Sequence, residues 1–267
     1  MKISIITPSF NQGSFIERTI ASVLAQRGDF ELEYLVVDAG STDATLSVLR
    51  RYEGRLRYVS EPDRGQCNAI NKGLRMTSGE VVAWLNSDDA YEPGALAAVA
   101  EVFRSGALWC FGMCRIIDER DREIRRAITR YKTAQSRRYG IRRLLGRNFI
   151  SQPAIFFRRD LIAQVGGLDE DLHLAMDYDL TLRFARVATP VFVPRPLATF
   201  RWHGDSKTAA RYRAGGWEAF RIACRHARGF ERLALPGHLA RYAAQVAVYR
   251  TLDIWLSPCG SSHSRRR

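Results

Sequence analysis

The sequence predicts an α/β protein with a mainly parallel central sheet flanked by helices. One observation is the apolar run at 81–85, which lies between Gly79 and the acidic pair Asp88 and Asp89. A short run of this kind, bounded by turn residues, is typical of a strand that is buried on both faces. The other observation is that such runs alternate with segments of helical periodicity, which is the pattern of parallel βα units.

The first half of the chain supplies this alternation. Strands are expected at 3–6, 34–37, 56–59 and 81–85, each followed by a polar turn. The helix between the first two strands begins near Ser14 and carries Phe15, Ile16, Ile20 and Val23 at helical spacing. A second helix ends near Tyr52, and a short third helix covers about 69–74. We interpret residues 1–113 as a nucleotide-binding half.

The second half gives shorter signals. We expect strands at 108–113 and 152–157, and helices after Pro93, Asp160 and Asp177 and at 217–223 and 236–256. A charged turn at 118–122 fits a β-hairpin. These elements divide the chain into one domain at 1–210 with halves 1–113 and 114–210, a helical extension at 211–256 and a disordered tail at 257–267.

Composition sets limits on partners and on location. The net charge of +13 and pI near 10.0 indicate a polyanionic partner such as nucleic acid, an anionic membrane or a phosphorylated substrate. The five cysteines lack metal-ligand spacing, which favours free thiols in a reducing compartment. Because no apolar run is long enough for a signal peptide or a membrane span, we expect a cytoplasmic protein.

Acidic side chains follow two of the expected strands. Asp38 comes after the second strand, and Asp88 and Asp89 come after the fourth. Ligands of open α/β sheets bind beyond the carboxyl ends of the strands, where these residues would meet. Adjacent carboxylates suit Mg²⁺ or Mn²⁺, although a solvated turn explains the pair equally well in isolation. With neither a P-loop nor a GxGxxG motif, a nucleotide would be held by carboxylates and a metal.

Four linked segments resemble one family. They are TPSFN at 7–11, DAGSTD at 38–43, EPDRGQ at 61–66 and WLNSDD at 84–89, in the order found in family 2 inverting glycosyltransferases of GT-A fold. The resemblance continues through 166–169 and 176–179 to 203–208, and covers about residues 1–210. Several linked motifs are far more specific than any one of them.

The resemblance implies roles for individual residues. Asp38 would hydrogen-bond the nucleobase, Pro8 would form a wall of the base pocket, and Asp88 would contact the donor ribose or sugar. The implied metal ligands for Mg²⁺ or Mn²⁺ are Asp89 and His203. The implied donor-binding residues are Thr7, Pro8, Asp38, Asp63, Gln66, Asp88 and Lys207.

Two positions depart from the commoner family pattern. Asn86 stands at the first acidic place of the metal motif, which leaves one negative charge fewer for the metal. Met176 stands where Glu more often precedes the catalytic acid. The resemblance makes Asp177 the general base, with Asp179 as an alternative, whereas an acid in the first turn of a helix also has a purely structural explanation.

The expected function is therefore inverting transfer of a sugar from a nucleotide-diphosphate donor, a UDP-sugar, to an acceptor hydroxyl. The resemblance implies a saccharide or lipid-linked saccharide acceptor in cell-surface polysaccharide or glycolipid synthesis. A metal-dependent nucleotidyltransferase is an alternative, but the glycine-rich triphosphate loop it would need is missing. A basic nucleic-acid-binding protein is a further alternative without a recognisable binding motif, so no nucleic acid is expected as a partner.

A basic segment at 130–147 is left unexplained by the donor site. Its arginines alternate with aromatic and aliphatic residues and have few acidic neighbours in the sequence. It fits either a solvated helical face or a surface that contacts anionic lipid. The second interpretation would place the enzyme as a peripheral protein on the inner face of the membrane.

Overall fold

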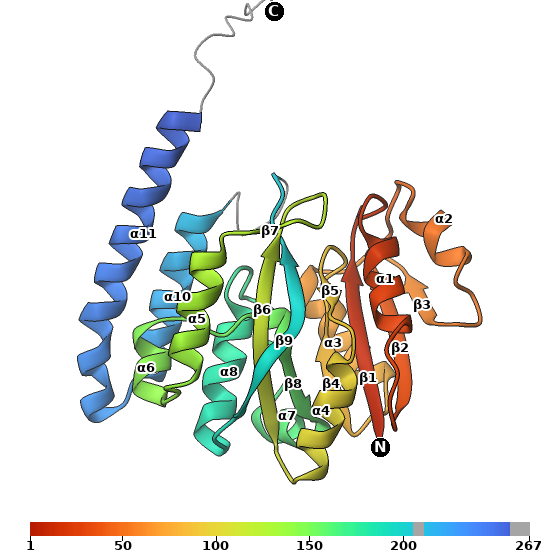
Figure 1. Cartoon of the computed structure of the whole chain (residues 1–267), viewed down its shortest axis with the longest axis horizontal. Helices are drawn as coiled ribbons and strands as arrows, with labels where there is room; N and C mark the ends of the chain where they lie inside the picture. Colours follow the sequence, from red (N-terminus) through yellow and green to blue (C-terminus); the bar gives the residue numbers. More distant parts are fainter. Residues whose placement is uncertain (205–210, 257–267) are drawn as a thin grey trace, which may run out of the picture.

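A single curved sheet forms the centre of the molecule, with helices on both sides (Figure 1). The computed structural model describes residues 1–204 and 211–256. In this part of the chain the sheet has nine strands in the order β3-β2-β1-β4-β8-β6-β9-β5, with β7 paired to β6. The strands are β1 Lys2–Ser9, β2 Glu31–Asp38, β3 Arg57–Ser60, β4 Val81–Trp84, β5 Ala90–Tyr91, β6 Trp109–Ile117, β7 Glu123–Ile124, β8 Ile155–Arg158 and β9 Val191–Arg201.

The helices follow the expected alternation in the first half and gather at one end of the sheet in the second (Figure 1). They are α1 Ile16–Leu24, α2 Thr45–Arg50, α3 Gln66–Met76, α4 Ala95–Arg104, α5 Arg126–Ser136, α6 Ile141–Gly146, α7 Arg159–Val165, α8 Met176–Val187, α10 Tyr212–His226 and α11 Leu235–Leu256. Two 3₁₀ helices, η1 Gln152–Ala154 and η2 Gly229–Ala234, complete the described elements.

The expected parallel unit is present in the first half of the chain. Strand β1 pairs in parallel with both β2 and β4, and β2 pairs in parallel with β3. Beyond β4 the sheet is mixed, because β8 runs antiparallel to both β4 and β6, whereas β6 and β9 are parallel. An apolar run that is buried on both faces has the same composition in either direction, so the sequence pattern does not distinguish these cases.

Successive side chains of the central strands enter two separate cores. Ile5 and Ala83 pack with α1, α2 and α4 on one face, whereas Ile6 and Trp84 pack with α3, α7 and α8 on the other. This alternation explains why these strands read as continuous apolar runs. The predicted double burial of the 81–85 strand is therefore confirmed.

Strand β9 is a long element that the sequence analysis did not predict. It contains Pro194 and Pro196, which argue against a central strand because proline cannot donate a ladder hydrogen bond. The strand tolerates them because its register with β6 shifts between Gly112 and Cys114. Earlier in the chain, the hairpin expected at 118–122 is confirmed by the pairing of β6 with β7. The expected strand at 152–157 begins instead with η1.

The expected C-terminal helices are present. Helix α10 buries Ile222 and Ala223 in the same core as α8, while α11 packs on α10 and α6 and then projects beyond the body (Figure 1). In the described ranges, no helix has both the length and the apolar character needed to cross a membrane. The free thiols expected from the sequence are confirmed for Cys67, Cys110, Cys114 and Cys224. Lys207, Cys259 and the tail at 257–267 lie outside the described residues.

Candidate active site

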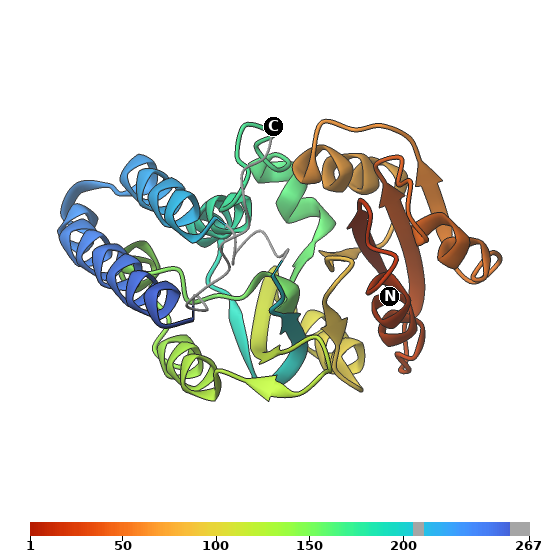
Figure 2. The same cartoon turned by 90° about the horizontal axis from the view of Figure 1, so that it is seen from above.

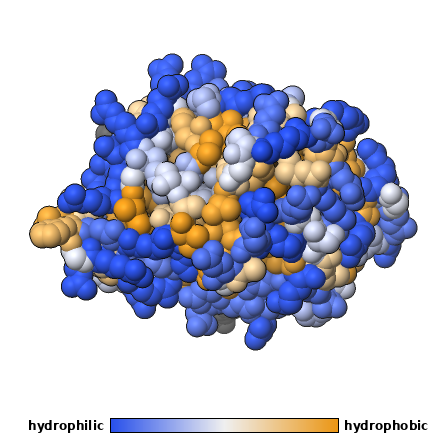
Figure 3. Space-filling model, turned by 90° about the horizontal axis from the view of Figure 1, so that it is seen from below, coloured by the Kyte–Doolittle hydropathy of each residue, from blue (hydrophilic) through white to orange (hydrophobic). Residues whose placement is uncertain are grey.

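A cleft of about 980 Å³ opens where the parallel strands end, within the size range of ligand sites. Figure 2 looks onto this edge of the sheet, and Figure 3 shows the opposite face, which is largely hydrophilic with apolar patches between the polar groups. One wall comes from the nucleotide-binding half and includes Pro8, Ala39, Asp63 and Asp88. The other wall comes from the later part of the chain and includes Ile128, Tyr131, Lys132, Asp177, Trp202 and His203. The fold thus brings the two predicted halves together around one cavity.

Most of the predicted site residues lie on the wall of this cleft. These are Pro8, Asp63, Gln66, Asp88, Asp177 and His203. Three others, Thr7, Asp38 and Asp89, are fully buried behind the wall. Lys207 is outside the part of the chain that the structure describes, so its predicted contact with the donor phosphates stays a prediction.

Asp88 and His203 meet at the cleft. The Oδ2 atom of Asp88 lies 3.0 Å from Nε2 of His203, although the two residues are far apart in the sequence. The imidazole also packs on Phe15 of the segment before α1, with ring centroids 4.7 Å apart. The carboxylate of Asp88 keeps 18% of its surface exposed, so it is accessible from the cleft. These two side chains form an oxygen and nitrogen pair suited to a divalent cation.

Asp89 points the other way. Its Oδ1 atom accepts a hydrogen bond from the main-chain N–H of Arg201 at 2.9 Å, and its Oδ2 atom accepts one from Nδ2 of Asn86 at 3.2 Å. Only 1% of the residue is exposed. Burial, and next the charge of Asp88, raise the pKa of Asp89 well above its ordinary value. The structure therefore does not present Asp89, the metal ligand that the resemblance implied, to the cleft.

Asn86 has a structural reason to be an amide. Its side-chain nitrogen donates to Asp89 and to Oε1 of Gln152, and its oxygen accepts a hydrogen bond from Nε2 of Gln66 at 2.7 Å. An aspartate could not donate these two bonds and would add a third carboxylate beside Asp88 and Asp89. Asn86, the residue that departs from the family pattern, is thus held in a hydrogen-bonded chain of amides with Gln66 and Gln152.

The segment after β2 is organised by Asp38. Its Oδ2 atom accepts hydrogen bonds from the main-chain N–H groups of Gly40 and Ser41 and from the hydroxyl of Ser60, and its Oδ1 atom accepts one from the Ser41 hydroxyl. These bonds fix the turn that presents Ala39 to the cleft. The contact of Asp38 with a nucleobase stays a prediction, and in this structure its oxygens are engaged within the protein.

Asp177 begins the opposite wall at the second residue of α8. Burial raises its pKa to about 6, although the main-chain N–H of Tyr178 and the charge of Lys132 lower it in part. A carboxylate with a pKa close to neutrality is suited to accept a proton at physiological pH. Lys132 lies on the same wall and donates a hydrogen bond to the Ser151 hydroxyl at 3.0 Å.

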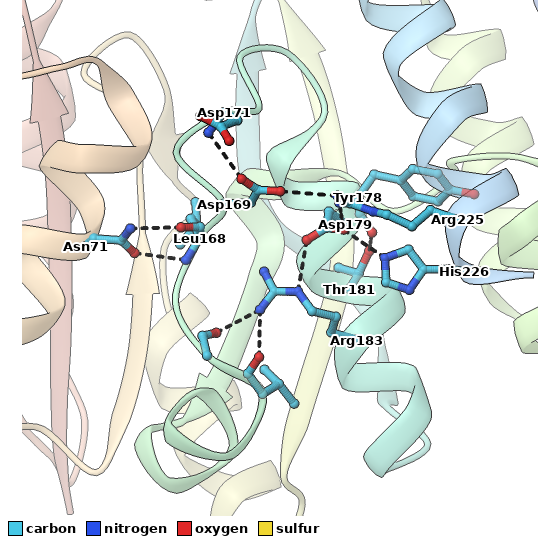
Figure 4. A network of polar contacts seen from close by, with 12 residues as sticks. Asn71, Leu168, Asp169, Asp171, Tyr178, Asp179, Thr181, Arg183, Arg225 and His226 are labelled. Atoms are coloured by element: carbon cyan, nitrogen blue, oxygen red, sulfur yellow. Dashed lines mark hydrogen bonds and ion pairs between the residues drawn. The ribbon is translucent and has the colours of Figure 1, made fainter.

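Asp179, the alternative base, belongs to a different network, shown in Figure 4. Its carboxylate accepts hydrogen bonds from Arg183 of the same helix and from Arg225 and His226 of α10. Burial favours a higher pKa, but the His226 hydrogen bond, the Arg183 charge and the Arg225 hydrogen bond outweigh it and lower the pKa of Asp179 to about 2. Asp179 therefore joins α8 to α10 and does not face the cleft.

We expect Asp179→Asn to lower the free energy of unfolding by about 3 kcal/mol, because it removes a buried carboxylate that pairs with Arg183 and Arg225. The folded pKa is depressed, so the stabilisation is present above about pH 4 and is lost as pH falls toward 2. Urea unfolding at pH 7 and pH 3 measures both effects. Asp171→Asn, an exposed acid in the nearby loop, serves as the control, and equal stability of the two variants at pH 7 would contradict this role.

The residues present fit a divalent cation only when a ligand completes the site. Within 1–204 and 211–256, no group of three or more His, Cys, Asp or Glu side chains is close enough to hold a metal. Asp88 and His203 offer two donor atoms, and Mg²⁺ is commonly held by one or two carboxylates together with substrate phosphates. The donor set therefore fits a cation that binds together with a diphosphate.

The sequence analysis missed several residues of the site. Lys132 was assigned to the basic segment, but it faces the cleft. Arg201 ends the unpredicted strand β9, and its side chain donates a hydrogen bond to the main-chain oxygen of Asp88. Gln152 hydrogen-bonds Asn86 and the carbonyl of Trp84. Only for Arg201 was there a signal, since it directly precedes the segment that includes His203.

Several known proteins are similar to this chain in sequence. The sequence model of Glycosyl transferase family 2 matches residues 4–166. An uncharacterized glycosyltransferase of Mycobacterium tuberculosis is 35% identical over 205 residues, which are 74% of each chain. An uncharacterized glycosyltransferase of Rickettsia typhi is 27% identical over 217 residues, or 77% of this chain and 65% of that protein.

Solved structures show the same fold at low sequence identity. S. aureus TarS 1-349 in complex with UDP-GlcNAc has a TM-score of 0.70 and 19% identity, over 97% of this chain and 76% of that one. A longer TarS structure is matched over 46% of its length. The mannosyltransferase PcManGT of Pyrobaculum calidifontis, in complex with GDP-Man and Mn²⁺, has a TM-score of 0.66 and 21% identity, over 94% of this chain and 80% of that one.

These findings confirm the GT-A-type α/β fold and the family resemblance drawn from the sequence. The matched segment contains all four linked motifs in full, and the relatives extend the match over about three quarters of the chain. The chain belongs to glycosyltransferase family 2.

Proposed function

We propose that this glycosyltransferase moves a sugar from a nucleotide-diphosphate donor to an acceptor hydroxyl by single displacement with inversion. The observation that carries the proposal is the division of the cleft between two walls. Asp88 of the first wall and His203 of the second meet as a cation-binding pair, and the second wall also presents Asp177 with a pKa of about 6. Neither of the alternatives weighed for the sequence is supported by the family assignment.

The proposed metal ligands are Asp88 and His203, with Asp88 in place of Asp89. Asp88 is the carboxylate of the pair that reaches the cleft, whereas both oxygens of Asp89 are hydrogen-bonded inside the protein. A bound Mg²⁺ or Mn²⁺ would neutralise negative charge on the leaving diphosphate. Asp63 and Gln66 line the same cleft and are the proposed donor contacts on the nucleotide side.

Asp177 is the proposed general base. Inversion requires that the acceptor hydroxyl attack the sugar from the face opposite the leaving diphosphate, and the base must lie on that acceptor side. Asp177 belongs to the wall built by the later part of the chain, across the cleft from Asp63 and Asp88, which supports this role. In its ionised form it accepts the hydroxyl proton as the new glycosidic bond forms.

The proposed donor is a UDP-sugar, with a GDP-sugar as the competing choice. TarS 1-349 binds UDP-GlcNAc and PcManGT binds GDP-Man with Mn²⁺, and both share this fold. Calorimetric titration with UDP-, GDP- and dTDP-sugars, with Mn²⁺ and with EDTA, tests the choice. The proposal expects one nucleotide to bind in Mn²⁺ and a product of inverted anomeric configuration. Retained configuration would overturn the single displacement.

The proposed acceptor is a saccharide or lipid-linked saccharide of a cell-surface polymer, and the proposed location is the inner membrane surface. Exposed arginines of α5, of α6 and of the segment between them support this location, because none of them pairs with an acid among the described residues. They are Arg130, Arg137, Arg138 and Arg142. Exposed apolar groups of α5, Ile128 and Tyr131, accompany them.

Changing these four arginines to Ser should weaken binding to anionic vesicles by at least about 100-fold at low salt, since each contributes on the order of 1 kcal/mol. Sedimentation with anionic and neutral vesicles at two salt concentrations measures the effect. The matched control changes four exposed arginines elsewhere, Arg27, Arg50, Arg55 and Arg75, and removes the same charge. An equal loss in the control would show that net charge alone is responsible, and no loss in either would leave the arginines as a solvated face.

A further inference from the structure

Arg201 is a buried arginine whose contacts the reaction scheme does not use. It is the last residue of β9, and only 1% of its surface is exposed. Its Nε atom donates to the main-chain oxygen of Asp88 at 2.9 Å, while its own N–H donates to the carboxylate of Asp89. One residue therefore holds both members of the acidic pair.

The rest of the guanidinium reaches the charged turn at 118–122. Its Nη1 atom donates to the main-chain oxygen of Asp118 at 2.9 Å, and its Nη2 atom donates to Oδ1 of Asp121 at 2.6 Å. Burial of a charged group is costly unless it is paired and fully hydrogen-bonded, and these contacts supply both conditions. Asp121 is thus the counter-charge of Arg201.

The turn is built to hold that position. Asp118 accepts hydrogen bonds from the main-chain N–H groups of Arg120 and Arg122, and Asp121 has a left-handed φ of 63°. From the opposite side, Arg18 of α1 donates to the main-chain oxygen of Glu119 at 2.9 Å. The turn therefore links helix α1, next to the nucleotide wall, with the end of β9.

We infer that Arg201 is a positioning residue for the donor site, and that the turn at 118–122 is the support that fixes its guanidinium. Arg201 orients the main chain at Asp88, and the direction of the Asp88 carboxylate toward the cleft follows from that main chain. The inference rests on the proposed role of Asp88 in holding a cation with the donor diphosphate. It gives a function to Arg201 and to the turn at 118–122, neither of which has a part in the proposed reaction.

A positioning role for Arg201 predicts a change in cation-dependent binding of the donor, which general structural support does not predict. A shifted Asp88 weakens binding that depends on the cation, whereas the hydrogen bonds of Arg201 go to Asp88, Asp89, Asp118 and Asp121 and not to the proposed base pocket at Pro8 and Ala39. We therefore expect Arg201→Met to raise the Kd of UDP in Mn²⁺ by at least about 10-fold, the scale typical of residues that orient metal ligands. In EDTA its Kd should stay within about twofold of the wild-type value, because cation-independent contacts are retained.

Asp121→Ala is the second variant, because Asp121 is half exposed and its loss is less disruptive to folding. Its Kd for UDP should also rise in Mn²⁺ and not in EDTA, but by a smaller factor. The double variant should bind UDP no more weakly than Arg201→Met, since both changes affect one contact. Arg115→Met is the matched control. Arg115 lies on β6 and pairs with Glu92. The change therefore breaks an arginine–carboxylate pair that includes neither Asp88 nor Asp89 nor the turn at 118–122.

The experiment is titration calorimetry of the full chain with UDP and with GDP, in Mn²⁺ and in EDTA, with the melting temperature of each variant measured alongside. Wild type that binds neither nucleotide in Mn²⁺ would overturn the proposed function and this inference with it. Wild type that binds, together with an unchanged Asp121→Ala variant, would overturn the inference alone. If Arg201→Met does not fold, Asp121→Ala and its control decide the question.

Discussion

Replacing Asp177 by Asn should lower kcat/KM by about 10²–10⁴, the usual contribution of a general base. The amide keeps the shape of the side chain but cannot accept the acceptor proton. Because burial raises the pKa of Asp177 to about 6, its ionised form is disfavoured in the folded protein, so the substitution should not lower the melting temperature. Loss of rate without loss of stability is therefore the expected result.

The pH dependence gives an independent measurement. In the wild type, activity should rise with pH through about 6 as Asp177 loses its proton, and this limb should be missing in the variant. Donor binding, measured by calorimetry, should be unchanged because the acceptor side alone is altered. Asp160→Asn is the control, since Asp160 also lies in the first turn of a helix but outside the cleft. A variant that loses donor binding as severely as rate would place Asp177 on the wrong side of the site.

The first half of the fold could be predicted because its signals are local. Each parallel strand of this half is a short apolar run, and the helix that follows it has an apolar face at helical spacing. The acidic residues fall at strand ends, which places them at one edge of the sheet. The residues that line the nucleotide wall, such as Pro8 and Asp63, follow from this arrangement and from the motifs.

Strand β9 could not be predicted because its main partner, β6, is distant in the sequence. Strand β9 contains two prolines, and its place beside β6 depends on a shifted register that only the tertiary structure defines. The position of Arg201 depends on this strand, and so do its contacts with Asp88 and Asp121. Lys132 shows the same limit, since its neighbours in the sequence suggested a surface helix while the fold turns its side chain into the cleft.

The direction of a side chain after a strand is also not local information. Asp88 and Asp89 are adjacent and chemically identical, and the motif alone assigned the metal to Asp89. The structure separates them through Arg201 and Asn86, which bind the two oxygens of Asp89 inside the protein. Which aspartate faces the ligand was therefore decided by residues 3 and 112 positions away in the sequence.

A matched pair of variants at these two aspartates gives the second large effect. Asp88→Asn should weaken binding of UDP in Mn²⁺ by at least about 100-fold and lower the melting temperature less than Asp89→Asn does, because the Asp88 side chain is partly exposed and Asp89 is buried. Asp89→Asn should mainly affect stability and leave the dependence of UDP binding on Mn²⁺ in place. Its new amide nitrogen replaces an acceptor oxygen and faces a buried donor, a mismatch of about 1–3 kcal/mol that lowers the melting temperature by several degrees.

Calorimetry in Mn²⁺ and in EDTA, together with thermal unfolding, separates the two aspartates. In EDTA, wild type and Asp88→Asn should bind UDP with similar weak affinity, because the contribution of Asp88 is expressed only when a cation is bound. An Asp89→Asn protein that remains folded should still gain affinity on addition of Mn²⁺. The opposite pattern, with cation dependence lost in Asp89→Asn and kept in Asp88→Asn, would return the metal to Asp89, as the sequence resemblance implied.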